Sequence, residues 1–420
     1  MTGFKNGEGT GMTRSSREIY RSLFHPQSIV VVGASNDSLK PGGRVTRNIK
    51  ENGYRGDLWV INPRTPSVMD LPTFGSVEEL PGPPDLALIA IPAPSVRDAL
   101  EDLGRKGTTS TMILTAGFGE KDREGKEEEK RFAEIAARHH MTLIGPNCSG
   151  FLTTTYAGKF AGLIPKVKKG AVDFISGSGA TVDYLMEQAT TRGLSFSNVV
   201  NVGNSVQTGV EEILALVDEN YGPENAPIIM LYMESVRNPG EFLRHARSLN
   251  RKGCTVVAIK SGVTAAGERA AASHTGALAT PDTAVQALFD KAGIIRVRSK
   301  MELIDVACAL TATRGPARGN RVCVVTDSGG PGVLLSDELG RQGLEQPLLG
   351  ERTRKRLSGL LPPESPVNNP VDCLPSRTPE QIREIFRILA EEEGDHIDVI
   401  AVCIGNSGMF DNWEIYREVI

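Results

Sequence analysis

The chain has 420 residues, more than one hydrophobic core usually serves, and this length predicts three domains. Its 40% hydrophobic and 23% charged residues, with 45 Gly and 25 Pro, are typical of α/β proteins rich in tight turns. A formal net charge of −4 gives no basic field that would attract nucleic acid or an anionic membrane. The six cysteines show no CxxC spacing, so neither a metal site nor a disulfide framework is expected.

Residues 1–17 are polar and lack the apolar stretch of a secretory signal, so we expect a disordered lead, with Met12 as an alternative start. No apolar run approaches the roughly 20 residues that span a bilayer. Unpaired cysteines fit a reducing compartment. The predicted location is therefore the cytoplasm, without a membrane anchor.

A first α/β unit is predicted over residues 18–152. It opens with the β-branched run SIVVVGAS (28–35), which reads as a buried parallel strand, and a helix is expected over 44–52. Short apolar runs then alternate with polar segments of helical period, which predicts a doubly wound sheet that binds ligands at the carboxyl ends of its strands. The further expected strands are 57–63, 85–92, 110–117 and 141–147.

Residues 153–169 show little periodicity and mark the boundary to a second α/β unit, predicted over 166–315. Its expected strands are 171–176, 228–234 and 255–262, and its expected helices include 182–191 and 239–250. A third unit, over 320–420, shows strands at 321–326 and 398–404 before the sequence ends. We expect this unit to be incomplete, with the chain either a fragment of a longer fused protein or dependent on another polypeptide.

The openings of the second and third units resemble each other at an offset of 150 residues. FISGSGATVDYLMEQATTRGL aligns with VVTDSGGPGVLLSDELGRQGL, which pairs Ser178 with Ser328 and Gly193 with Gly343. This pattern indicates duplication of one flavodoxin-like scaffold. Chance convergence of two Gly/Ser turns is the alternative.

Small residues and cations follow the first predicted strand. They are Gly33, Ser35, Lys40, Arg44 and Arg47. Backbone N–H groups combined with Lys and Arg side chains suit a polyphosphate. The spacing is not GxGxxG, and the second strand ends in Asn62 and Pro63 instead of an acid, so a plain dinucleotide site is disfavoured. The alternative is a Gly-rich turn with solvated cations.

Two further strand ends are expected on the same edge of the sheet, at Pro92 and at Asn147. Prolines at strand ends stiffen a groove that suits a flat adenine and a pantetheine arm, and Asn147 offers both a donor and an acceptor. Each of these features is also found in ordinary loops.

In the second unit, Ser176, Gly177, Ser178 and Gly179 lead directly into a helix. Such a turn offers unpaired N–H groups and the positive end of a helix dipole to an anion, and glycines let a phosphate come close. The alternative is an ordinary helix N-cap by Ser178.

His274 stands in a segment of very small residues. Apart from Glu268, Arg269, His274 and Leu278, residues 264–280 are all Ala, Gly, Ser or Thr. Small neighbours leave an imidazole room to move, although an Ala-rich surface helix with an incidental histidine explains the pattern too. Glu234 ends the strand IIMLYME, and a carboxylate there is placed to orient an imidazole so that its other nitrogen attacks phosphorus.

Several motifs occur in a fixed order: GAS(x)6GGR (33–44), GPNCSGF (145–151), SGSGA (176–180), GNSVQTGVE (203–211), Glu234 in YMES, and AAASHTGALA (270–279). Together they resemble the α part of the ADP-forming acyl-CoA synthetases, the superfamily that includes succinyl-CoA synthetase. TDSGGPG (326–332) and NNPVD (368–372) continue the match in the third unit, so the resemblance covers nearly the whole chain.

The resemblance implies an α/β fold with an N-terminal Rossmann-like CoA-binding domain and two flavodoxin-like ligase domains. It also implies the reversible conversion of acyl-CoA, ADP and phosphate into acid, CoA and ATP. By carry-over, the phosphate binds at residues 176–179, His274 becomes phosphorylated and Glu234 supports it. Coenzyme A would lie along Gly33, Ser35, Lys40, Arg44, Pro92 and Asn147.

Two departures from the family stand out. An acidic residue often follows the GN motif, whereas Gln207, Thr208 and Gly209 stand here, which puts substrate or phosphate details in doubt. The sequence also shows no ATP-grasp domain, so ATP or ADP and Mg²⁺ are expected on a separate ATP-grasp β subunit or domain, in a hetero-oligomer. The rival readings are a catalytically inactive sensor of CoA or acyl-CoA and an NAD-type oxidoreductase.

Overall fold

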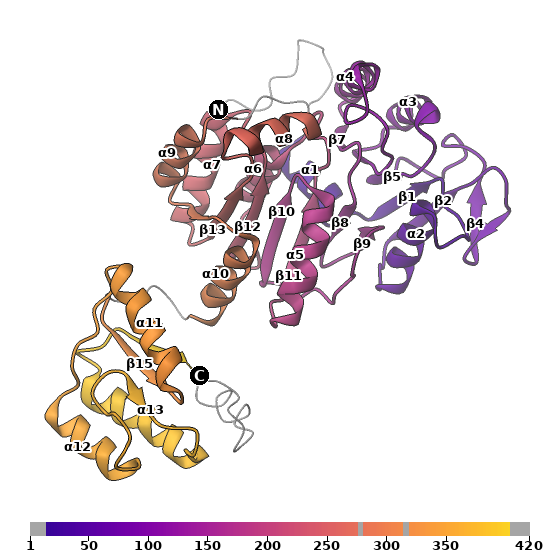
Figure 1. Ribbon diagram of the computed structural model, residues 1–420. Helices are drawn as coiled ribbons and strands as arrows, with labels where there is room; N and C mark the ends of the chain where they lie inside the picture. Colours follow the sequence, from indigo (N-terminus) through magenta and orange to yellow (C-terminus); the bar gives the residue numbers. More distant parts are fainter. Residues whose placement is uncertain (1–13, 276–279, 314–318, 404–420) are drawn as a thin grey trace. The chain divides into compact units, whose positions relative to one another are not determined.

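The computed structural model describes residues 14–275, 280–313 and 319–403 (Figure 1). The chain forms two compact units, Met1–Ala312 and Thr313–Ile420. The expected disordered lead lies outside the described residues as far as residue 13. Its last residues belong to the fold, because Ser15 caps helix α1 (Ser16–Phe24) and Arg14 donates to the carbonyl oxygens of Gly107 and Thr108. Among the described helices, none is long and apolar enough to cross a membrane.

The first sheet has the strand order β3-β4-β2-β1-β5-β6-β7, and only the β3–β4 pair is antiparallel. Its strands are β1 (Ser28–Val32), β2 (Asp57–Ile61), β3 (Ser67–Val68), β4 (Leu71–Phe74), β5 (Leu86–Ile89), β6 (Ser110–Ile113) and β7 (Thr142–Ile144). The connecting helices are α2 (Pro41–Glu51), η1 (Ala93–Ser95), α3 (Val96–Lys106) and α4 (Arg123–Arg138). The strand order reverses between β1 and β5, and ligands of open α/β sheets bind at such a switch point.

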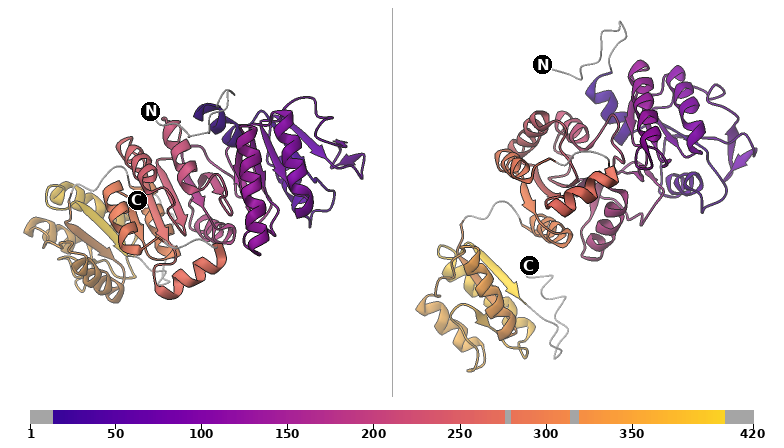
Figure 2. Two further views of the ribbon diagram at one scale, coloured as in Figure 1. Left: turned by 90° about the horizontal axis from the view of Figure 1, so that it is seen from above. Right: turned by 45° about the horizontal axis from the view of Figure 1, so that its top comes forward.

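Helices cover both faces of this sheet, as the view from above in Figure 2 shows. Strand β1 is buried along its whole length because its alternate side chains enter two different cores. Ile29 and Val31 pack with α1 and α2, whereas Val30 and Val32 pack with α3 and α4. A run of β-branched residues without polar alternation is the pattern expected of such a strand.

The second sheet has the order β14-β13-β12-β10-β11-β8-β9. Its strands are β8 (Gly150–Leu152), β9 (Ala157–Lys159), β10 (Val172–Ser176), β11 (Phe196–Asn201), β12 (Ile228–Met233), β13 (Thr255–Lys260) and β14 (Ile295–Val297). Its helices are α5 (Gly179–Thr191), α6 (Val210–Glu219), α7 (Pro239–Arg251), α8 (Ala265–Thr275), α9 (Asp282–Ala292) and α10 (Lys300–Ala312). The three strands expected from the sequence are present as β10, β12 and β13, whereas β8, β9, β11 and β14 were not predicted. Strand β8, which falls within the predicted first unit, pairs with β11 in the second sheet.

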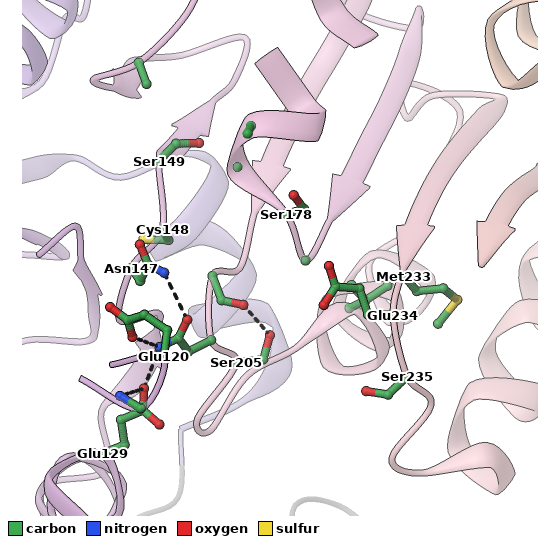
Figure 3. A pocket seen from close by; sticks show the side chains of 18 of the residues that line it. Glu120, Glu129, Asn147, Cys148, Ser149, Ser178, Ser205, Met233, Glu234 and Ser235 are labelled. Carbon is green, nitrogen blue, oxygen red and sulfur yellow. Dashed lines mark hydrogen bonds between the residues drawn. The ribbon is translucent and has the colours of Figure 1, made fainter. Parts of the chain in front are cut away.

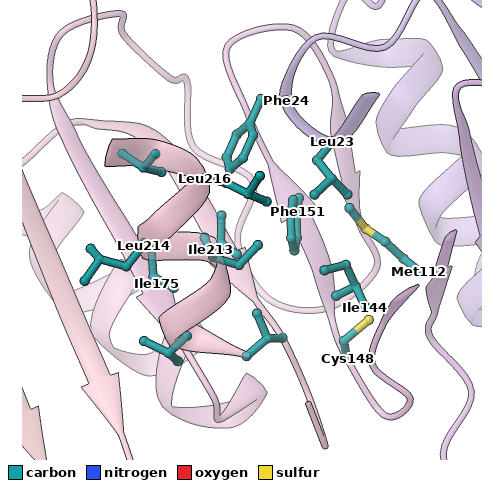
Figure 4. Packing of buried hydrophobic residues seen from close by; sticks show 14 of the residues in the cluster. Leu23, Phe24, Met112, Ile144, Cys148, Phe151, Ile175, Ile213, Leu214 and Leu216 are labelled. Atoms are coloured by element: carbon teal, nitrogen blue, oxygen red, sulfur yellow. The ribbon is translucent and has the colours of Figure 1, made fainter. Parts of the chain in front are cut away.

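One hydrophobic core runs from the first sheet into the second. Phe151 of β8 packs against Phe24 of α1, with ring centroids 5.9 Å apart, and the same cluster includes Ile213 of α6 (Figure 4). Tyr156 is buried next to them and donates its hydroxyl to the carbonyl of Leu23. The two sheets therefore share a core, which holds their strand ends in a fixed relation.

The C-terminal unit contains a three-stranded parallel sheet in the order β16-β15-β17. Its elements are β15 (Val322–Thr326), α11 (Gly329–Arg341), α12 (Glu351–Leu360), β16 (Val371–Asp372), α13 (Pro379–Glu393) and β17 (Val399–Cys403). In the NNPVD motif, the Asn369 side chain accepts from the Val324 N–H and donates to the Val322 carbonyl, so it pairs with β15 as a neighbouring strand would.

The two openings that repeat in the sequence share their local geometry. Helices α5 and α11 each have 13 residues and follow an extended Ser, Ser178 or Ser328. In each turn the hydroxyl two residues earlier, on Ser176 or Thr326, donates to the carbonyl of that serine and accepts from its N–H. The common geometry supports the reading of a duplicated scaffold.

Close packing of α2 on the turn after β1 explains the glycines of the first motif. A Cβ on Gly42 would lie 2.0 Å from the Gly33 carbonyl oxygen, so a side chain there forces the helix away from the turn. We expect Gly42→Ala to lower the free energy of unfolding by about 1–3 kcal/mol. Denaturant unfolding measures this. Gly82→Ala is the matched control because no atom lies within 4 Å of its added Cβ; equal stability of both variants would contradict the account.

Candidate functional site

A cavity of about 470 Å³ lies in the N-terminal unit, where loops at the strand ends of both sheets meet. The first sheet contributes the β6–α4 loop, α4 and the segment after β7 (Figure 3). The second sheet contributes the start of α5, the β11–α6 loop and the residues after β12. Carboxyl ends of parallel strands are where binding sites of α/β proteins gather.

The predicted phosphate turn forms one wall of this cavity. Gly177, Ser178 and Gly179 line it, and Ser176 is buried behind them at the end of β10. The Ser178 hydroxyl donates to the Thr181 hydroxyl at 3.0 Å and makes no capping hydrogen bond to the α5 backbone. Ser178 is thus the N-cap residue of α5 by position, without the side-chain hydrogen bond of an ordinary N-cap. The start of α5 remains suited to an anion.

Glu234 follows β12 directly and also lines the cavity. His274 lies in α8, and its side chain is outside the described residues. The chain that carries it is held beside the Glu234 loop at both ends: the Ser261 N–H donates to the Met233 carbonyl at 3.0 Å, and the Thr280 hydroxyl bonds to the Val236 backbone at 3.3 Å.

Asn147 lines the same cavity in a left-handed conformation (φ 58°). Its side chain donates to the side-chain oxygen of Asn204 at 3.3 Å, which links the first sheet to the β11–α6 loop. The Asn204 amide nitrogen in turn donates to Glu120 and to Glu129, both at 2.6 Å. Two carboxylates thus converge on one nitrogen at the cavity wall (Figure 3).

The two carboxylates differ in their surroundings. Burial alone raises the pKa of Glu120, but bonds from the Gly117 N–H and from Asn204 outweigh burial and lower it. Burial raises the pKa of Glu129, and the bonds from Asn204 and Gly119 compensate only in part. The negative charge of Glu120 raises the pKa of Glu129 further.

The other predicted binding residues lie at the switch point of the first sheet and do not line the cavity. Gly33 (φ 88°) follows β1, and Pro92 precedes η1 after the neighbouring β5. Ser35 accepts from the Asp37 N–H within the turn. Lys40 is the N-cap residue of α2 and exposed, as is Arg44 one turn later. The predicted site residues therefore fall into two regions of one unit.

A buried ion pair supports the α5 side of the cavity. The Lys159 side chain is fully buried, bonds to Asp183 of α5 and donates to the Ala161 carbonyl at 2.5 Å. Burial lowers the pKa of Lys159, and the charge of Asp183 acts in the opposite direction. Asp183 itself lines the cavity.

Gln207, which departs from the family pattern, hydrogen-bonds to the backbone at β7. Its side-chain oxygen accepts from the Leu143 N–H at 2.7 Å, and its nitrogen donates to the Met141 carbonyl at 3.2 Å. The amide therefore satisfies the open edge of β7. A carboxylate would accept the first bond but could not donate the second.

The chain is similar to known proteins over both of the regions that contain the predicted site residues. Residues 27–154 match the model of a CoA binding domain, and residues 169–310 that of a succinyl-CoA ligase like flavodoxin domain. The chain is 37% identical over 383 residues to the acetate–CoA ligase [ADP-forming] II subunit alpha of Pyrococcus furiosus, covering 91% of this chain and 82% of the relative. It is 32% identical to the acetate–CoA ligase [ADP-forming] I of Archaeoglobus fulgidus, with 95% of this chain and 56% of that relative covered.

The structural comparison agrees. The dinucleotide forming acetyl-coenzyme A synthetase 1 of Ca. Korarchaeum cryptofilum, solved with phosphate and ADP, matches with a TM-score of 0.86 and 27% identity. The match covers 95% of this chain and 84% of that one. The chain belongs to the family of ADP-forming acyl-CoA synthetases. The α/β fold class and the family predicted from the sequence are thereby confirmed.

Several residues of the cavity were not predicted from the sequence. Glu120 follows a strand in TAGFGE, so its position at a strand end was a usable signal. Asn204 lies in the motif GNSVQTGVE (203–211), but the sequence predicted no role for it. Glu129 sits among charged residues of α4, and nothing in that pattern distinguishes it from its solvated neighbours. Lys159 and Asp183 depend on contacts between distant segments.

Breaking the Lys159–Asp183 pair from one side leaves a buried charge. We expect Asp183→Asn to lower the free energy of unfolding by about 3 kcal/mol. Glu187→Gln, an exposed change on the same helix, is the matched control and should stay within about 0.5 kcal/mol of wild type. Because burial lowers the pKa of Lys159, the loss should shrink at alkaline pH, where the lysine is neutral. Denaturant titrations at two pH values measure this, and a loss no larger than that of the control would contradict it.

Proposed function

We propose that this protein is the CoA-handling and phosphoryl-accepting part of an acid–CoA ligase that forms ATP from ADP. The reaction is acyl-CoA, ADP and phosphate to acid, CoA and ATP, and it is reversible. Two relatives bear the name acetate–CoA ligase [ADP-forming], and a third is named 4-hydroxybutyrate–CoA ligase [ADP-forming].

One observation carries the proposal: a single cavity is lined by the start of α5, by Glu234 and by Asn147 of the CoA-binding domain. The segment that carries His274 is tethered on both sides of Glu234, at Met233 and Val236. Phosphoryl transfer through an imidazole requires an anion-binding helix start, a carboxylate and a nearby histidine.

Coenzyme A would lie along the carboxyl edge of the first sheet. Gly33 and Ser35 offer backbone and hydroxyl groups at the switch point, and Lys40 and Arg44 offer positive charge to its phosphates. Pro92 bounds the neighbouring strand end. Asn147, on the same edge and in the cavity, would meet the pantetheine end.

In the reaction, the Ser176–Gly179 turn would hold phosphate against the thioester carbon, so that phosphate displaces CoA and an acyl phosphate forms. His274 would then take the phosphoryl group, and Glu234 would accept a hydrogen bond from its other ring nitrogen, keeping the attacking nitrogen unprotonated. An imidazole with an ordinary pKa near 6.5 is mostly neutral at pH 7 and thus nucleophilic. Positioning of this kind contributes up to roughly 7–11 kcal/mol to such steps.

An ATP-grasp subunit or domain would bind ADP with Mg²⁺ and receive the phosphoryl group from His274. Two relatives, matched over 82% and 76% of their length, are named as α subunits, which supports a partner chain and a hetero-oligomer. The cytoplasm is the proposed location.

The histidine route is tested by phosphorylation. The protein is mixed with an ATP-grasp subunit from the same genome and labelled ATP, and we expect acid-labile label on wild type and none on His274→Asn, which cannot form a phosphoramidate. Glu234→Gln should reduce the rate of labelling by about 100-fold, because the imidazole loses its orienting carboxylate.

His140→Asn is the matched control. His140 has a left-handed backbone (φ 51°) that Asn tolerates, so the variant should fold and label like wild type. Label that persists in His274→Asn, or a wild type that takes up none, would contradict the proposal.

A further inference from the structure

We infer that the carboxylate pair Glu120–Glu129 is the proton-transfer site for the sulfur of coenzyme A, with Glu129 as the group that gives and takes the proton. The inference rests on the proposed function and adds a catalytic residue to it. Its basis is the convergence of two carboxylates on the Asn204 amide nitrogen, each at 2.6 Å, on the cavity wall.

The thioester step needs such a group. An alkyl thiol of the cysteine kind has a pKa of about 8.5, so it is mostly protonated at neutral pH and a poor nucleophile. Acyl-CoA formation therefore needs a base at the sulfur, and the reverse step needs an acid that protonates the departing thiolate. One carboxyl group with a pKa near neutrality serves both directions.

The cavity contains other acids, but they are engaged elsewhere. Asp183 is paired with the buried Lys159, and Glu211 accepts the Arg237 N–H at 2.6 Å. Glu234 stands at the end of β12 in the second sheet, next to the tethers of the His274 segment. Glu120 and Glu129 alone among these acids belong to the CoA-binding domain.

Geometry places this pair on the sulfur side of the reacting centre. The anion-binding start of α5 forms the wall contributed by the second sheet, and Asn147 stands on the wall contributed by the first. The thioester carbon must lie between the phosphate and the sulfur, so the sulfur is nearer the first sheet. Asn204 connects Asn147 to both carboxylates through its own side chain.

The two carboxylates have different tasks. Glu120 accepts the Gly117 N–H at 2.5 Å and the Asn204 amide, which keep it ionised. Both hydrogen bonds that Glu129 makes within the described chain, from Gly119 and Asn204, fall on Oε1. Its Oε2 therefore retains the capacity to carry a proton. Two acids this close titrate as a pair, and one proton is held where burial is greater.

When acyl-CoA is consumed, a phosphate oxygen bonds to the acyl carbon, the C–S bond breaks, and its electron pair moves to sulfur. The sulfur takes the proton from the Glu129 carboxyl, which leaves CoA as a thiol and Glu129 as a carboxylate. In the opposite direction, Glu129 takes the thiol proton while sulfur attacks the acyl phosphate and phosphate departs.

Charges around Glu129 set the pH at which it acts. Glu120, from the β6–α4 loop, raises its pKa, and Lys126 of α4 lowers it. The other charged groups that line the cavity are Asp183, Glu211, Glu234 and Arg237. Acyl-CoA synthesis should therefore rise, and acyl-CoA cleavage should fall, as pH increases through the pKa of Glu129.

The test uses the protein with its ATP-grasp subunit and measures two steps separately: labelling from ATP, and release of CoA from acyl-CoA with phosphate. We expect Glu129→Gln to label like wild type but to release CoA about 100-fold more slowly or worse, and to lose the pH dependence that CoA release shows in the wild type. Glu120→Gln should shift that dependence to lower pH, because it removes a negative neighbour of Glu129. Glu134→Gln, an exposed change on α4, should change neither step.

A second readout does not depend on activity. In the protein labelled with ¹³C at glutamate side chains, one carboxyl carbon should titrate with a raised pKa, and this signal should vanish in Glu129→Gln. Loss of both steps in Glu129→Gln, an unchanged pH profile, or the absence of a raised carboxyl would overturn the inference. A wild type that neither labels nor releases CoA would instead overturn the proposed function.

Discussion

The shared hydrophobic core of the N-terminal unit is the constraint on which the rest of the structure depends. The antiparallel hairpin β8–β9 extends the second sheet, yet Phe151 and Tyr156 pack against α1 of the first domain. Burial of each large apolar side chain stabilises the fold by roughly 1.5–3 kcal/mol, so separating the two sheets would lose much of this stabilisation. Their facing strand ends are thereby fixed, and the cavity between them is a consequence of packing that occurs well away from it.

Electrostatics within that cavity follows from the same arrangement. The acids that line it lie on different elements, and hydrogen bonds or ion pairs restrain them: Asp183 by Lys159, Glu120 by backbone N–H groups and Asn204. The start of α5, whose free N–H groups suit an anion, lines this cavity together with Arg237. These groups suit a phosphate even though carboxylates border the same space. In the C-terminal unit, the turn before α11 has the same hydrogen bonds as the turn before α5.

Much of the fold was predictable because it depends on local sequence. Buried parallel strands such as 28–32 and 228–233 are continuous apolar runs, and the Gly/Ser turns before α5 and α11 carry their geometry in a few residues. What escaped depends on contacts between segments far apart. No local sequence pattern indicates the pairing of β8 with β11. The same is true of the hydrogen bonds from Asn204 to Glu120 and Glu129, and of the bond between Gln207 and the backbone of β7.

The central claim is that thioester and phosphate meet in the cavity between the two sheets. A crystal structure of the protein with CoA and inorganic phosphate tests it most directly. The account predicts phosphate bound by the N–H groups at the start of α5, with the pantetheine arm passing Asn147 so that the sulfur lies between this phosphate and Glu129. Phosphate bound elsewhere, or a CoA whose sulfur points away from the cavity, would contradict it.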